Sequence, residues 1–281
     1  MSYKTILVHV DESEHLASRV KLAAKIAMAE NAHLIGAAMT GVSRFLEETA
    51  AISPGEPTMQ PYLETLRQRA SRALDAFEEM VQKAGVLSYE RRLVDDDAAG
   101  GISLHARYCD LVVIGQDDLD EPSPTTMAGF PEYVTMSSGS PTLIVPYAGI
   151  FEKVGERILI AWNASSQAMH AIRSALPFLR RAKNVDLVIY NPTARKDVYG
   201  DEPGADIALY LTRHGVNVNV MQEEIGGEID VGNALLSLAT GQGTDLIVMG
   251  CYGHSRFREM LLGGATRVIL ESMTVPVLMA H

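Results

Sequence analysis

The sequence repeats itself. Tyr3–Ser13 reads YKTILVHVDES, and Gly155–Ser165, 152 positions later, reads GERILIAWNAS. Both stretches have a few polar residues, an apolar run, an Asp or Asn, and a Ser two positions further on. DLVVIG at Asp110–Gly115 likewise returns 135 positions later as DLIVMG at Asp245–Gly250. Self-similarity of this kind predicts two copies of one domain.

The two offsets differ by 17, so the first half carries that many extra residues ahead of Asp110. Gly41–Gln60, rich in Pro, Gly and Thr, is predicted to be a loop that holds them. Each half closes on a similar segment, PTLIV at Pro141–Val145 and PVLMA at Pro276–Ala280. We therefore expect one domain over residues 1–148 and a second over residues 154–281.

Short apolar runs without strict alternation are typical of buried parallel strands. They occur at residues 5–10, 33–39, 110–114, 142–145, 157–162, 185–190, 245–249 and 276–280. Helical patterns lie between them, for example at Ser13–Glu30 and at Ser166–Arg181, where Asn163 or Ser165 can cap the start. The alternation predicts an α/β fold: two tandem Rossmann-like domains, each with a five-stranded, mostly parallel sheet and helices on both faces.

Composition excludes several functions. The formal net charge of −11 argues against a nucleic-acid partner and against an anionic membrane surface. The sequence has no apolar stretch of about 18 residues and no signal-peptide pattern. Cys109 and Cys251 have neither disulfide nor zinc spacing, which favours a reduced cytoplasm as the location. No ligand set predicts a metal site, and no nucleophile with its base predicts catalytic residues.

A glycine-rich loop follows the strand DLIVMG. Gly250 and Gly253 are followed after nine residues by Gly263 and Gly264, which open a helical pattern. Glycine lets the backbone approach a phosphate closely, and free N–H groups of a loop and a helix N-terminus bind anions. Between Gly250 and Arg267 the residues also carry three arginines and one acid, a charge of +2. This combination predicts a polyphosphate site, although a tight packing turn is the plainer alternative.

The matching loop of the first half is different. Asp118 takes the place of one loop glycine, and Ala128-Gly129 takes the place of the glycine pair. From Gly115 to Glu132 there are five acids and no Lys or Arg. A triphosphate would meet a charge of −5, so we expect that the first half does not bind ATP in the same way.

These residues resemble the universal stress protein family. Its nucleotide-binding members have an Asp at the end of the first strand and G-x-x-G-x9-G-[ST] after the fourth. Gly250, Gly253 and Gly263 match this pattern, and the resemblance extends over both halves. It implies a tandem member that binds ATP or another adenine nucleotide, with or without Mg²⁺. Two positions depart from the pattern: Gly264 replaces the hydroxyl residue, for which Thr266 or Ser255 can substitute, and Asn163 replaces the Asp.

The resemblance implies a nucleotide site in the second half. Its predicted residues are Ala161, Asn163, Met249, Gly250, Gly253, His254, Gly263, Gly264, Ala265 and Thr266. For Ala161, Met249 and Ala265, ordinary core packing is an equally good explanation. For His254, a solvated loop position is the alternative to a phosphate contact.

Three functions fit these patterns. The first is a stress-response nucleotide sensor or regulator, the second a slow ATPase or small-molecule hydrolase, and the third a nucleotide-independent stress scaffold. The apolar last strands, PTLIV and PVLMA, predict an intramolecular pseudo-dimer of the two domains, because exposed strand edges tend to pair. A homodimer of chains is a further expectation.

Overall fold

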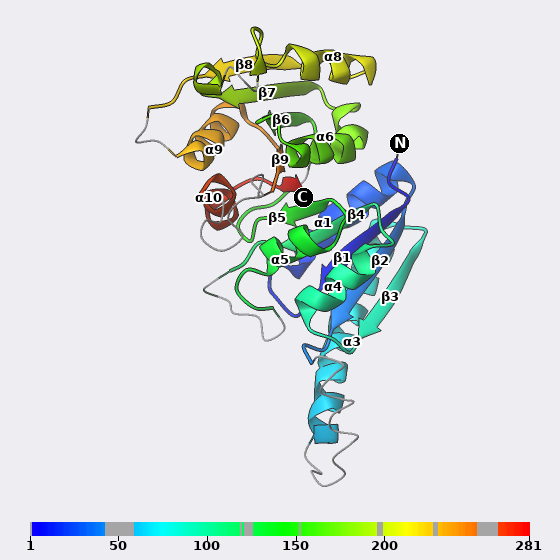
Figure 1. Ribbon diagram of the computed structural model, residues 1–281. Helices are drawn as coiled ribbons and strands as arrows, with labels where there is room; N and C mark the ends of the chain where they lie inside the picture. Colours follow the sequence, from blue (N-terminus) through cyan, green and yellow to red (C-terminus); the bar gives the residue numbers. More distant parts are fainter. Residues whose placement is uncertain are drawn as a thin grey trace. The chain divides into compact units, whose positions relative to one another are not determined.

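The computed structural model describes residues 2–42, 59–118, 120, 126–151, 153–195, 199–226, 230–251 and 264–281. The chain divides into two compact units, Ser2–Thr142 and Leu143–His281. Strands and helices alternate within each unit, as the repeat predicts (Figure 1). The finer domain boundaries at residues 148 and 154 stay a prediction.

In the described part of the first half, four helices lie between the strands. Its elements are β1 (Thr5–Val10), α1 (Leu16–Glu30), β2 (His33–Met39), α3 (Met59–Ala84), β3 (Tyr89–Val94), α4 (Ala98–Ala106), β4 (Leu111–Gly115), α5 (Phe130–Ser137) and β5 (Thr142–Val145), the last lying where the chain divides. Within this half the parallel strands run in the order β3-β2-β1-β4.

The second half repeats the plan. Its elements are β6 (Arg157–Ala161), α6 (Ser166–Leu179), β7 (Asn184–Tyr190), the short 3-10 helix η1 (Pro192–Arg195), α8 (Ala205–Arg213), β8 (Asn219–Glu223), α9 (Val231–Gln242), β9 (Leu246–Gly250), α10 (Gly264–Ser272) and β10 (Val277–Ala280). Its strands are parallel in the order β10-β9-β6-β7-β8. The predicted tandem α/β fold with parallel sheets is confirmed.

One aspartate per domain ties the beginnings of two strands together. The Asp110 carboxylate accepts hydrogen bonds from the backbone N–H groups of Lys4 and Thr5, at 2.7 and 3.0 Å. The Asp245 carboxylate does the same for the start of β6, accepting from Gly155, Glu156 and Arg157 at 2.8, 3.0 and 3.1 Å. The repeated Asp of DLVVIG and DLIVMG therefore has a structural role at the amino ends of the strands.

The extra length of the first half is mostly helix. Met59 and Gln60, predicted to be loop, belong to α3, which has 26 residues against 9 in α8. Residues 43–58 of the predicted loop lie outside the described residues. The helix packs closely on β2, since a Cβ on Gly36 would lie 2.5 Å from the buried ring of Phe77. The prediction of a loop was therefore wrong for Met59 and Gln60, whereas Gly41 and Val42 lie outside any helix or strand as predicted.

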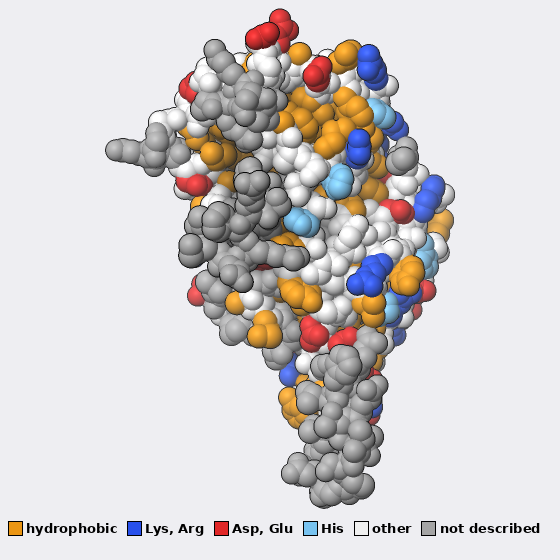
Figure 2. Space-filling view, in the orientation of Figure 1, with side chains coloured by type: hydrophobic (Ala, Val, Ile, Leu, Met, Phe, Trp, Pro, Cys, Tyr) orange, Lys and Arg blue, Asp and Glu red, His pale blue; other side chains and the backbone are white. Residues whose placement is uncertain are grey.

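The described surface mixes side-chain types. On the face in Figure 2, the described Lys and Arg side chains are scattered among acidic, hydrophobic and uncharged ones. In the described part of the chain, no helix combines the length and the apolar character that crossing a membrane requires.

Candidate functional site

Four of the predicted site residues lie at the carboxyl ends of two neighbouring strands. Ala161 ends β6 and pairs with Met249 of β9, and Gly250 follows as the last residue of β9. Asn163 comes two residues after β6 and is exposed. Ligands of parallel α/β sheets bind at this edge, next to the point where the strand order reverses, which here is between β6 and β9.

Asn163 organises the turn that leads into α6. Its side-chain oxygen accepts hydrogen bonds from the Ser165 backbone N–H at 3.1 Å and from the Ser165 hydroxyl at 2.6 Å. The Ser165 Oγ in turn accepts from the Ala168 N–H at 3.1 Å and caps the helix. Of the two predicted caps, Ser165 is therefore the residue that acts directly. Gly250 allows this helix to approach, because a Cβ there would lie 2.4 Å from the Ala168 nitrogen.

Three more of the predicted residues begin α10. Gly264 is its first residue and is exposed, Ala265 is half-buried, and Thr266 is buried at 5% exposure. The burial of Thr266 makes it a poor substitute for the missing family hydroxyl. The predicted residues Gly253, His254 and Gly263, like Ser255, lie outside the described residues.

A carboxylate that the sequence analysis missed lies beside the start of α10. Asp230 caps α9 by accepting from the Gly232 N–H at 2.7 Å. Its other oxygen lies 3.3 Å from where a Cβ on Gly264 would be. A serine at 264, the residue type of the family pattern, would therefore press on Asp230.

The charge around the start of α10 also differs from the +2 counted along the sequence between Gly250 and Arg267. Arg267, one of the three arginines, is an exposed residue whose Nε donates to Glu271 at 2.7 Å. The other charged residues of that count, Arg256, Arg258 and Glu259, lie outside the described residues. Because Asp230 comes from a different helix, a count along the loop could not include it.

The first domain has the same turn after β1, but there the side chain of a buried arginine, Arg19, is hydrogen-bonded to the turn. The Asp11 carboxylate accepts from the Ser13 N–H at 3.2 Å and from the Ser13 hydroxyl at 2.7 Å, as Asn163 does from Ser165. It also accepts from Nη2 of Arg19 at 2.6 Å, and Nε of Arg19 donates to the His9 carbonyl at 2.8 Å. The side chains of Arg19 and Asp11 are only 4% and 8% exposed. The residue 152 positions after Arg19 is Ala171.

Burial and this ion pair set the protonation of the cluster. Burial opposes ionisation of Asp11, but the Arg19 guanidinium holds the pKa of the carboxyl well below its usual range. Burial lowers the pKa of His9 to about 4, against a smaller opposing effect of Asp11. At neutral pH the cluster is therefore an ion pair beside a neutral imidazole.

Two of the acids predicted to repel phosphate contact other groups of the first domain. The Asp117 carboxylate accepts from the Gly129 N–H at 2.7 Å, at the start of α5. Asp118 lies 3.0 Å from Nε2 of His15. Burial raises the pKa of Asp117, and its hydrogen bonds from the backbone at Gly129 and Phe130 act in the opposite direction.

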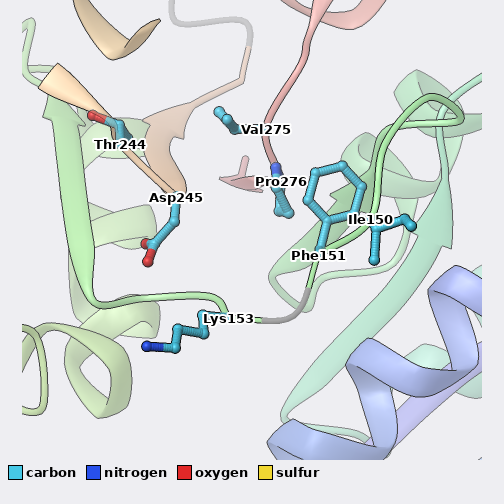
Figure 3. Close-up of a pocket in the computed structure, with 7 residues that line it drawn as sticks. All are labelled: Ile150, Phe151, Lys153, Thr244, Asp245, Val275 and Pro276. Carbon is cyan, nitrogen blue, oxygen red and sulfur yellow. The ribbon is translucent and has the colours of Figure 1, made fainter. Parts of the chain in front are cut away.

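A cavity of about 510 Å³ lies at the opposite edge of the second sheet. Its lining residues come from the amino ends of β9 and β10 and from the segment before β6: Ile150, Phe151, Lys153, Thr244, Asp245, Val275 and Pro276 (Figure 3). The Asp245 carboxylate is occupied by the three backbone N–H groups described above. Lys153 lies 3.2 Å from the Glu156 carboxylate. The charged groups of this cavity therefore already have partners within the chain. The cavity also lies at the amino ends of the strands, away from the carboxyl ends.

Comparison with known proteins identifies the family. The model of the universal stress protein family matches the chain twice, at residues 2–146 and 155–281. The chain belongs to the universal stress protein family. The predicted resemblance is thus confirmed, including its tandem form. No curated protein matches the sequence.

Two solved structures agree with this fold over nearly the whole chain. A universal stress protein from Archaeoglobus fulgidus DSM 4304 has 15% identity and a TM-score of 0.73, with 98% of this chain and 97% of that one covered. A putative universal stress protein from Pseudomonas aeruginosa UCBPP-PA14 has 15% identity and a TM-score of 0.61, with coverage of 99% and 93%. A universal stress protein solved in complex with cAMP matches 53% of this chain at 23% identity, with a TM-score of 0.37 and all of its own length covered.

The buried His9 predicts that acid destabilises the first domain. Its pKa falls from 6.5 to about 4 on folding, so between these pH values the unfolded chain binds a proton that the folded domain excludes. Stability is then fully present above pH 6.5 and is lost as the pH falls toward 4. A shift of this size corresponds to about 3 kcal/mol in the free energy of unfolding. Amide hydrogen exchange in β1 and α1 as a function of pH measures it.

The variant His9→Phe is the control for this titration. It keeps a ring against Phe130, whose centroid lies 4.9 Å from that of His9, and it cannot take up a proton. Its exchange-derived stability should vary much less over the same pH range. Equal acid loss in the parent and in His9→Phe would show that other groups cause it.

Proposed function

We propose that the second domain binds ATP or a related adenine nucleotide at the carboxyl ends of β6 and β9 and at the start of α10. The glycine loop that joins β9 to α10 would hold the phosphates. The protein would act as a stress-response nucleotide sensor or regulator, which reports nucleotide occupancy rather than turning the nucleotide over.

One observation carries this proposal: corresponding positions are open in the second domain and closed in the first. Asn163 and Gly264 are exposed, whereas Asp11, the counterpart of Asn163, is buried against Arg19. Asn163 retains amide N–H donors that the structure does not use for the turn, and these suit ribose or base acceptors. The start of α10 offers backbone N–H groups, which suit phosphate.

Asp230 bears on the form in which the nucleotide binds. A bare phosphate at the start of α10 would lie near this carboxylate and be repelled by it. Within the described residues, no three His, Cys, Asp or Glu side chains group as a metal site. We therefore propose the magnesium complex of the nucleotide as the ligand, with the Asp230 carboxylate as a hard oxygen group that suits the cation.

We expect calorimetry to find one adenine nucleotide per chain. Only the second domain combines the open edge with the glycine spacing, so a single class of site should appear. Trp162, the one tryptophan of the chain, precedes Asn163 and should report binding through its fluorescence. Magnesium should tighten ATP binding in the parent protein, and this effect should shrink in Asp230→Asn.

The possible outcomes separate the parts of this proposal. Two equivalent sites per chain would contradict the assignment to the second domain. No binding of ATP, ADP or AMP at any magnesium concentration would favour the nucleotide-independent scaffold. Steady release of phosphate from ATP, at a rate that rises with the fraction of protein that has bound ATP, would favour the ATPase. The cytoplasmic location, the pseudo-dimer and the homodimer stay predictions.

A further inference from the structure

The first helical turn of α5 is capped from a distance. Its N-cap residue, Gly129, has a positive φ of 82° and no side chain to accept the free N–H groups. Asp117, twelve residues earlier in the chain, supplies the missing acceptor at 2.7 Å from the Gly129 nitrogen. The residue 135 positions after Asp117 is Tyr252, so the second domain has no carboxylate at that sequence position.

Arg19 fills the space at the carboxyl ends of β1 and β4. It contacts Asp11 and the His9 carbonyl, and its Nη1 lies 2.6 Å from where a Cβ on Gly115 would be. Gly115 and Asp11 are the counterparts of Gly250 and Asn163. In the second domain, Gly250 and Asn163 form the strand-end part of the proposed nucleotide site. In the first domain, the guanidinium lies beside the two equivalent residues.

We propose that the first domain is a self-liganded version of the family site, in which Asp117 is the resident anion of α5 and Arg19 fills the adjacent space. A carboxylate presents oxygens and a negative charge to helix N–H groups, as a phosphate does. This inference concerns the first domain alone and does not rest on nucleotide binding by the second.

A buried polar atom without a partner lies beside the start of α5. His9 is 1% exposed, and its Nε2 has no hydrogen-bond partner among the described residues. Its ring contacts Phe130, the first residue of α5. Buried polar atoms normally find partners. A buried polar atom with an unmet hydrogen bond therefore lies next to the start of α5.

The test is chemical rescue of Asp117→Ala in the full-length protein. Removing the side chain should leave a space for a small anion, and amide exchange in α5 should become roughly fivefold faster, the size of a lost helix cap. Sodium formate should restore most of the lost protection, whereas sodium chloride at equal ionic strength should not. Formate is the probe because it is the carboxylate of Asp117 without the chain.

Two further variants keep this test decisive. Asp97→Ala removes an exposed cap of α4, where the side chain accepts from Gly100 at 2.8 Å, and it should show no selective response to formate. Asp117→Asn keeps an oxygen acceptor in the same place, so it should retain more protection than Asp117→Ala and show no formate response. The proposal is overturned if α5 exchanges at the parental rate in Asp117→Ala, or if formate acts equally on Asp117→Ala and Asp97→Ala.

Discussion

Arg19→Ala is expected to lower the stability of the first domain by about 3–5 kcal/mol, the usual effect of removing one partner from a buried ion pair. The Asp11 carboxylate would remain buried without its guanidinium partner, beside the Ser13 turn and the His9 ring, whose Nδ1 lies 3.7 Å away. The loss should appear as faster amide exchange in β1, α1 and β4, since Arg19 contacts the His9 carbonyl and lies against Gly115. Trp162 fluorescence follows the unfolding of the second domain in the same sample.

Arg67→Ala is the matched control. Its side chain is 34% exposed and pairs with Asp95 at 2.8 Å, so its removal should change stability by about 1 kcal/mol or less. Combining Asp11→Asn with Arg19→Met removes both charges and should recover much of the stability lost in Arg19→Ala. If Arg19→Ala and Arg67→Ala have equal effects, the buried pair does not hold the first domain together.

The fold could be predicted because repetition and apolar runs report the buried strands directly. The two outer strands of the sheets have weaker signals. Tyr89–Val94 reads YERRLV with alternating exposure, and Asn219–Glu223 reads NVMQE with exposed ends. Polar residues suit a sheet edge, which must not pair with other chains. The same residues hide the edge strand from a search for apolar runs.

The site could be predicted only where the chemistry is local in sequence. The turn at Asn163, the cap at Ser165 and the helix start at Gly264 all follow from neighbouring residues. Asp230 could not be found in this way, because it reaches α10 from the start of α9. Arg19 left a signal, since it is the cation of α1 that falls on the apolar face, between the buried Leu16 and Val20. Its partner is eight residues away and required the structure.

The acids of the first loop act by where they lie as well as by their charge. Acids of the first loop were predicted to repel a phosphate by their number. Asp117 instead occupies the start of α5, and Asp118 lies against His15. A position taken by the chain excludes a ligand more effectively than exposed charge, which salt screens. The first domain is therefore expected to reject nucleotide at high salt as well as at low salt.

Gly253→Asp is expected to weaken ATP binding by two to three powers of ten. The substitution copies Asp118 into the second domain, at a loop position that lies outside the described residues. Two like charges about 4 Å apart repel by roughly 4 kcal/mol at an effective dielectric near 20. Each factor of ten in affinity is about 1.4 kcal/mol, which gives the expected range after partial screening. Calorimetry and Trp162 fluorescence measure the affinity, and thermal melts check the fold.

The fold should survive Gly253→Asp, because the first domain has Asp at the corresponding position. The counterpart of His15, whose Nε2 lies 3.0 Å from the Asp118 carboxylate, is Gln167, so the new carboxylate would not have that imidazole as a partner. Asp118→Gly is the reciprocal variant and should create no second site, since Arg19 and Asp117 still fill the first domain. If Gly253→Asp binds ATP as well as the parent does, the glycine loop does not hold phosphate, and the protein is better explained as a scaffold whose loop serves packing alone.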